Sequence, residues 1–217
     1  MSYIALILPS LLRGTVISIE LFVVTLIFSL PLGLPLALGE NSKIAPIRWF
    51  CKGFVYVFRG TPLMLQLFFF YFFFPIYLNI RMDAFPTAAL TFILNYAAYF
   101  AEIYRGGLKS IDIGQYEAAH SLGLSRWQTF KDIVIPQMTR IVLPPVSNEV
   151  IVLIKDTALA SCIALADLMR VAQSTVNRDG TLVAYIIAAA IYLLFSAFFT
   201  VILSKLEERY SKYEEVA

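Results

Sequence analysis

The sequence has little charge for its length. Of its 217 residues, 15% are charged and 59% are hydrophobic, whereas a soluble globular domain has about 25% charged residues. It also lacks any run of lysines and arginines, which excludes the basic patches typical of nucleic-acid-binding proteins. The apolar excess is too large for one globular core, and it indicates that a lipid bilayer is the solvent of this chain.

Cysteine and histidine are also scarce. The topology expected below places the two cysteines, Cys51 and Cys162, on opposite sides of the membrane, where they cannot pair within one chain, so we interpret them as packing thiols. The one histidine, His120, has no second histidine or cysteine at ligand spacing, which argues against a metal site. The first apolar run is too long for a cleavable signal peptide and lacks a cleavage site. There is no Asn-x-Ser/Thr acceptor either, and a bacterial inner membrane is the expected location.

Long apolar stretches predict an all-α membrane protein. A helix needs about 20 apolar residues to cross a bilayer, and four stretches of 18 to 24 residues carry no charge. We expect five transmembrane helices, at about 12–39, 58–80, 84–108, 133–157 and 181–205. The fourth is the least apolar, since it contains three prolines and Glu149. Kinked helices are tolerated where neighbours or a polar cavity satisfy the freed backbone groups, so this span is the candidate lining of a pathway.

The distribution of lysine and arginine predicts the orientation, because cytoplasmic loops carry the excess. With the N-terminus outside, ten fall in cytoplasmic segments: Lys43, Arg48, Lys52, Arg105, Lys109, Arg126, Lys131, Lys205, Arg209 and Lys212. Four fall outside: Arg13, Arg81, Arg170 and Arg178. The excess predicts an external N-terminus and a cytoplasmic C-terminus. It also places the segment between the third and fourth spans in the cytoplasm.

That cytoplasmic segment contains helix-capping signals. Asp112 is a good N-cap with Gln115 three residues later, and Gly123 suits the position just after a helix. We therefore expect a short helix over 113–122. A second helix is expected to begin at Ser125, capped together with Gln128. Taken alone, these signals also fit an ordinary amphipathic connector.

A spaced motif runs through the same segment. It reads Glu117-Ala118-Ala119, three residues, Gly123, nine residues, then Ile133-Val134-Ile135-Pro136. This resembles the EAA cytoplasmic loop of ABC importer membrane subunits, with Ile135 in place of the family's leucine. In that family the loop is where a separate ATPase docks. The resemblance implies a coupling loop at 112–136 whose ATPase-coupling residues are Glu117, Ala118, Ala119 and Gly123.

Other segments resemble the polar amino acid permeases within that superfamily. They are Arg59-Gly60-Thr61-Pro62-Leu63, Ala98 to Gly107, Gly114 to Ala119, Asn148-Glu149 and Leu153 to Thr157. The similarity covers about residues 12–208 of a single membrane domain spanning 1–217. It implies the type I importer fold and a permease subunit that forms an amino acid pathway as a dimer, without naming the amino acid. The implied partners are a second permease chain, identical or related, two cytoplasmic ATPases and an external binding protein.

The chain itself has no phosphate-binding loop. The phosphate-binding motif requires lysine directly after glycine. In the segment Gly106-Gly107-Leu108-Lys109-Ser110, Leu108 separates the two, so the motif is not matched. ATP and magnesium are therefore expected on the partner ATPase, and no cofactor is expected on this chain. A secondary transporter would usually have more spans and inverted repeats, which are not visible here. A membrane-embedded enzyme would need a catalytic constellation that one histidine does not supply.

Charged residues inside expected spans are costly and are functional candidates. Glu149, Lys155 and Asp156 cluster in the fourth span, and the two acids are seven apart on one helix face. Two acids and one base suit a zwitterion, so these three are the predicted substrate-binding residues. The alternative is an internal ion pair that only holds helices together. We also expect Arg59 and Glu102 to pair at the inner membrane boundary, because their spans are sequential and antiparallel.

Overall fold

The computed structural model describes residues 3–211, and all regular structure within that range is helical. Lys212, one of the ten cations counted for orientation, lies outside the described residues. The elements are α1 Tyr3–Glu40, α2 Ala45–Gly60, α3 Leu63–Tyr77, α4 Ala84–Lys109, α5 Ile113–Ser121, α6 Arg126–Gln128, η1 Thr129–Val134, α7 Ile135–Asp156, η2 Thr157–Ile163, α8 Leu168–Asp179 and α9 Val183–Ser211.

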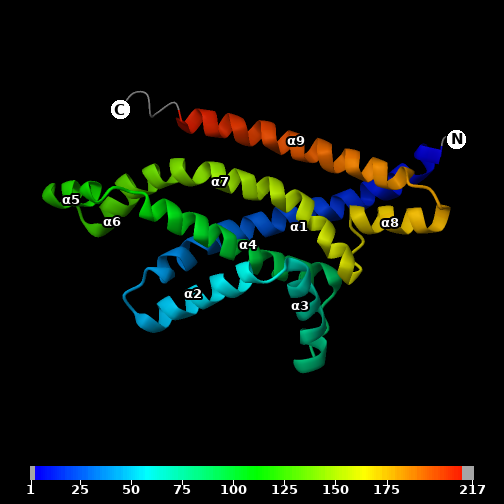
Figure 1. Cartoon of the computed structure of the whole chain (residues 1–217), viewed down its shortest axis with the longest axis horizontal. Helices are drawn as coiled ribbons and strands as arrows, with labels where there is room; N and C mark the ends of the chain where they lie inside the picture. The colour runs from blue at the N-terminus through cyan, green and yellow to red at the C-terminus, as the bar shows by residue number, and fades with distance from the viewer. Residues whose placement is uncertain (1–2, 212–217) are drawn as a thin grey trace.

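The long helices run side by side, and the short helices α5, α6 and α8 lie at the two ends of the bundle, whereas α2 and α3 lie beside its middle (Figure 1). At one end are α5 and α6, close to the end of α9. At the other are α8 and the start of α1. The end of α9 and the start of α1 therefore lie at opposite ends of the molecule, as the predicted orientation requires.

Three helices of the described chain are long and apolar enough to cross a membrane: α1, α4 and α9. The helix α4 agrees in position with the expected span at 84–108, whereas α1 begins at Tyr3, well before residue 12. A fourth candidate is the pair of α2 and α3 taken together. The helix α7 is not among them, so the count of five spans stays a prediction.

The expectation of one helix over 58–80 is wrong. The structure has two helices, α2 and α3, and the helix direction bends by 109° at the break between them. Pro62 provides no N–H and disfavours a helical conformation at Thr61, which is extended (φ −120°, ψ 146°). The segment from Gly60 to Leu63 therefore ends one helix and begins another.

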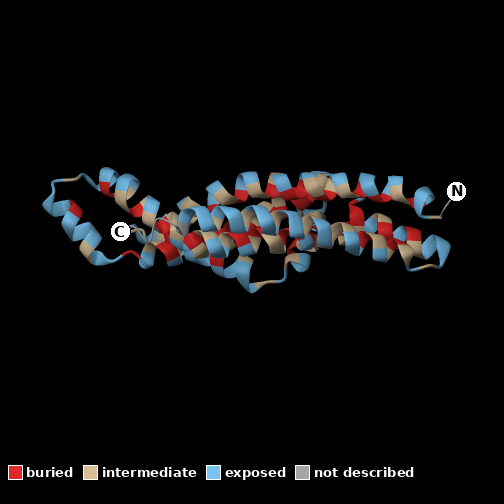
Figure 2. Ribbon diagram, turned by 90° about the horizontal axis from the view of Figure 1, so that it is seen from above, coloured by how far each residue is buried: buried red, intermediate tan, exposed pale blue. Residues whose placement is uncertain are grey.

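Small residues let the central helices approach closely. Seen from above, buried residues line the inner faces of the bundle while the outer faces are exposed (Figure 2). A Cβ on Gly33 of α1 would lie 2.8 Å from Phe100 of α4, and one on Gly107 of α4 would lie 2.3 Å from Val142 of α7. Glycine at such contacts is typical of membrane helix packing. The most apolar stretch of α4 is 61% buried and that of α9 only 6%, so α4 is central and α9 peripheral.

Candidate functional site

The break between α2 and α3 leaves backbone carbonyls without helical partners, and two buried amides satisfy them. The Gln66 side chain donates to the carbonyls of Phe58 (2.8 Å) and Thr61 (3.1 Å). The Asn95 amide, from α4, donates to the same Phe58 carbonyl at 3.0 Å and to Oε1 of Gln66 at 2.9 Å. Unpaired buried carbonyls cost free energy, so these hydrogen bonds stabilise the break as part of the native fold.

A hollow of about 510 Å³ lies beside this break. Its walls come from the helix break, from α4, from α7 and from the start of η2. The lining residues are Arg59, Gly60, Thr61, Pro62, Leu63, Asn95, Tyr96, Tyr99, Glu149, Val152, Asp156 and Leu159. We call this space the break hollow. It combines aromatic rings with two carboxylates and one guanidinium, a composition suited to a small polar ligand.

Two of the three predicted substrate residues meet in the break hollow. Glu149 and Asp156 both line it and are both half-buried. The Tyr96 hydroxyl donates to Oδ2 of Asp156 at 2.8 Å, which orients that carboxylate. Lys155 does not line the hollow and is exposed. Adjacent residues on a helix point about 100° apart, so Asp156 and Lys155 face different surroundings.

The basic group in the break hollow is Arg59. Its Nη1 lies 3.4 Å from Oε2 of Glu102, which confirms the expected ion pair between these residues. Its guanidinium also lies over the Tyr99 ring, 5.5 Å from the centroid. Tyr96 and Tyr99 are site residues that sequence reasoning missed. Their spacing from Glu102 on one helix was the only available signal.

A second hollow of about 570 Å³ adjoins the first. The two share Arg59, Gly60 and Tyr99. We call the second one the charged hollow, because it is lined by Glu40, Asn41, Lys52, Val55, Tyr56, Arg59, Gly60, Tyr99, Glu102, Arg105 and Lys109. Arg105 pairs closely with Glu102 and lies 3.3 Å from the buried Glu40, so it links α1 to α4 there.

The predicted coupling loop forms α5, α6 and η1 at one end of the molecule (Figure 1). Asp112 caps α5 by accepting from the Gly114 N–H at 2.6 Å. The Gln115 side chain does not complete a capping box; its Oε1 instead accepts from the Gln137 amide. The helix ends at Ser121, within one residue of the expected 122.

The end of α5 depends on Gly123. Its φ is +76°, and its N–H donates to the His120 carbonyl while the Leu124 N–H donates to that of Ala119. This is the Schellman arrangement, which glycine adopts without strain. The capping box between Ser125 and Gln128 is confirmed, with both of its hydrogen bonds present.

The surface of this loop is partly apolar. Leu122, Trp127 and Ile113 are 79%, 69% and 73% exposed. Glu117 and Ala118 are exposed, but Ala119 is 1% exposed and packs inside the loop. Of the motif's two alanines, only Ala118 is therefore free to contact a partner.

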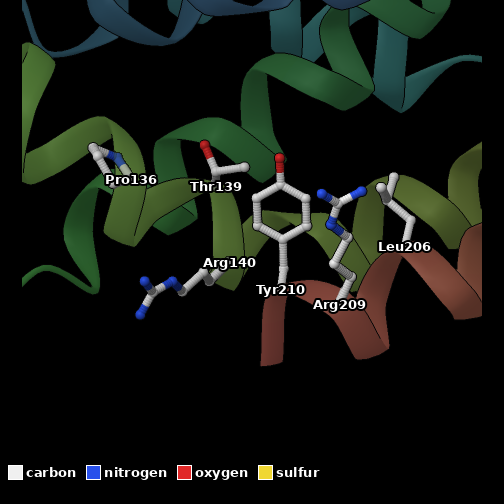
Figure 3. A pocket seen from close by; sticks show the side chains of 6 residues that line it. All are labelled: Pro136, Thr139, Arg140, Leu206, Arg209 and Tyr210. Carbon is white, nitrogen blue, oxygen red and sulfur yellow. The ribbon is translucent and has the colours of Figure 1, made fainter. Parts of the chain in front are cut away.

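A further hollow, between α7 and α9, contains none of the predicted site residues. It has a volume of about 560 Å³ and is lined by Pro136, Thr139, Arg140, Leu206, Arg209 and Tyr210 (Figure 3). The Arg140 and Arg209 side chains extend to opposite sides of the Tyr210 ring. Within residues 3–211 no cluster of histidine, cysteine and acidic side chains is arranged to hold a metal ion.

Comparisons with known proteins agree with this architecture. The L-cystine transport system permease protein TcyB of Bacillus subtilis is 40% identical over 207 residues, which cover 94% of this chain and 88% of that protein. The glutamate/aspartate import permease protein GltK of Escherichia coli O6:H1 is 37% identical, covering 93% and 94%. A crystal structure described as an amino acid ABC transporter with histidines superimposes with a TM-score of 0.87 at 32% identity, covering 96% of this chain and 99% of that one.

A family model gives the same assignment over most of the chain. Residues 29–212 match the model described as "Binding-protein-dependent transport system inner membrane component". The matched region includes the helix break, both acids of the break hollow and the whole coupling loop. This chain belongs to the family of inner membrane components of binding-protein-dependent transport systems.

Proposed function

We propose that this chain is the permease subunit of an ATP-driven ABC importer for polar amino acids in a bacterial inner membrane. The observation that carries the proposal is the meeting of Glu149, Asp156 and Arg59 in one hollow beside a broken helix. An ammonium group pairs with the acids and a carboxylate with a cation, and broken helices commonly form substrate sites in membrane transporters. The relatives named for cystine and for glutamate/aspartate transport support the substrate class.

The proposed assembly has two permease chains, identical or related, each with five spans and an external N-terminus. Two cytoplasmic ATPases dock on α5 through Glu117, Ala118 and the turn at Gly123, and they supply ATP and magnesium. Ala119 shapes the loop from within. An external binding protein delivers the amino acid. The exposed apolar residues of the loop support this docking surface, since burying them against a partner is favourable.

The test is uptake by proteoliposomes that contain the permease, its ATPase and its binding protein. We expect uptake of a subset of the twenty amino acids only when all three proteins and ATP are present. Uptake without the ATPase that collapses with an ionophore would instead indicate a secondary transporter. Chemical conversion of the amino acid would indicate an enzyme.

The acids are tested in the same system. Glu149→Gln and Asp156→Asn are each expected to weaken uptake, because losing a charge-assisted hydrogen bond costs about 1.5–3 kcal/mol, or about ten- to hundred-fold in affinity. Lys155→Gln tests the third predicted substrate-binding residue, which does not line the break hollow. Glu20→Gln, at an exposed acid of α1, is the matched control and should transport normally. Normal kinetics in both hollow variants would leave these acids with a packing role only.

A further inference from the structure

Arg59 occupies the boundary between the two hollows. It lines both, at the last turn of α2, and its side chain is 38% exposed. Tyr99 lies beneath the guanidinium and the helix break follows directly after it. A group in either hollow is therefore within the reach of this one cation.

The two hollows have opposite charge. In the break hollow, Glu149 and Asp156 outnumber Arg59. The charged hollow has four cations, Lys52, Arg59, Arg105 and Lys109, against the acids Glu40 and Glu102. These formal charges favour a zwitterion in the break hollow whose ammonium group lies toward the acids and whose carboxylate lies toward Arg59.

The ion pair of Arg59 is the looser part of its network. Glu102 is already held by two closer contacts from Arg105, through Nε at 3.0 Å and through Nη2. The Arg59 contact with the same carboxylate is 3.4 Å. If Arg59 moves to another carboxylate, Glu102 is still paired with Arg105. The move therefore leaves no buried charge without a partner.

We infer that Arg59 binds the α-carboxylate of the transported amino acid. On binding, this carboxylate replaces Glu102 as the ion-pair partner of Arg59. A guanidinium suits this role, since its planar donors match a carboxylate in pairs. The inference rests on the proposed function. It adds that Arg59 is the residue through which the permease selects an α-amino acid as its substrate. It also assigns to Arg59 the role that the sequence assigned to Lys155.

The experiment measures direct binding to the detergent-solubilised permease–ATPase complex without the binding protein, so that only the permease selects. The probes are the amino acid that wild-type proteoliposomes take up best and the amine left when its α-carboxyl is removed, such as agmatine for arginine or histamine for histidine. Wild-type complex is expected to bind the amino acid about ten- to hundred-fold more tightly than the amine. Arg59→Gln should abolish that preference, mainly by weakening amino acid binding.

Two further variants keep the test decisive. Lys52→Gln removes a cation that lines only the charged hollow and should retain the wild-type preference. Glu102→Gln removes the competing carboxylate and should tighten amino acid binding while amine binding stays the same. The inference is overturned if a folded Arg59→Gln complex still prefers the amino acid over the amine as strongly as wild type does. If Arg59→Gln does not fold, the inference is overturned by a Glu102→Gln complex that binds the amino acid no more tightly than wild type. Absence of ATP-driven amino acid uptake by wild-type proteoliposomes would instead refute the proposed function itself.

Discussion

At the scale of single residues, Gly123 shows how one backbone angle sets the shape of the coupling loop. A Cβ there would meet nothing within 4 Å, so the cost of substitution comes only from its left-handed backbone. That cost is about 1–2 kcal/mol for a residue with a side chain. Gly123→Val is expected to disrupt the end of α5 and raise the ATP hydrolysed per amino acid taken up, with the chain still inserted in the membrane.

The matched control for Gly123 is Gly53→Ala, at an exposed helical glycine of α2 that is equally uncrowded. It should leave coupling unchanged, because an ordinary helical residue tolerates a side chain. A Gly123→Val complex with wild-type stoichiometry of ATP to amino acid would contradict the role given to this turn.

Asp167, the N-cap of α8, is expected to make stability depend on pH. The residue is 0% exposed, and burial raises the pKa of its carboxyl to about 6 from an ordinary value of 3.8. Between these two values the folded state keeps a proton that the unfolded state has lost. The free energy of unfolding therefore falls as pH rises from about 4 to about 6, by up to about 3 kcal/mol.

Thermal unfolding in detergent at pH 4.5 and pH 7 measures this effect. Asp167→Asn retains a capping oxygen for the Arg170 N–H and should remove most of the pH dependence. Asp179→Asn is the control, since Arg178 and Tyr3 lower the pKa of Asp179 to about 2, outside the tested range. An equal pH dependence in wild type and Asp167→Asn would show that other groups cause it.

At the scale of elements, the break between α2 and α3 is maintained by side chains from two helices. Gln66 is 7% exposed and Asn95 is 3% exposed, so neither water nor lipid replaces their hydrogen bonds. Gln66→Leu and Asn95→Leu are each expected to lower the free energy of unfolding by about 1–3 kcal/mol, because carbonyls at the break become unpaired. The double variant should cost less than the two single effects added, since the amides bond to each other.

Thermal stability of the purified chain in detergent measures both losses. Gln173→Leu, on the partly exposed face of α8, is the control and should change stability by less than about 0.5 kcal/mol. If either buried amide is replaced without loss of stability, the break is held by something other than these bonds.

At the scale of the whole molecule, α5 and α8 lie at opposite ends of the bundle (Figure 1). The predicted orientation places α5 in the cytoplasm and α8 outside. In a chain with Cys51 and Cys162 replaced by serine, an impermeant maleimide added to intact cells should label Asn177→Cys on α8 and spare Ser121→Cys on α5. Both should react after the membrane is permeabilised, and labelling of Ser121→Cys alone in intact cells would reverse the topology.

The features predictable from the sequence are those that depend on neighbours along the chain. Apolar runs located α4 and α9 closely, and capping residues located the ends of α5 and the start of α6. The expected span at 58–80 did not anticipate the break at Pro62, and the bend of 109° between the two helices depends on packing against α4. A local pattern indicates where a helix is interrupted, whereas the direction taken by the next helix is set by the surfaces that it meets.

Only the tertiary structure decided which charges share a site. Glu149 and Asp156 face the break hollow because α4 and the α2–α3 break close it, while Lys155 turns away on the same helix. Arg59 and Tyr96 reach that hollow from segments about 50 to 100 residues distant in sequence. Composition and spacing determined that this chain is helical, apolar and capped at its loop. The site arises from contacts between helices distant in sequence, because no single helix face carries both the acids and the cation.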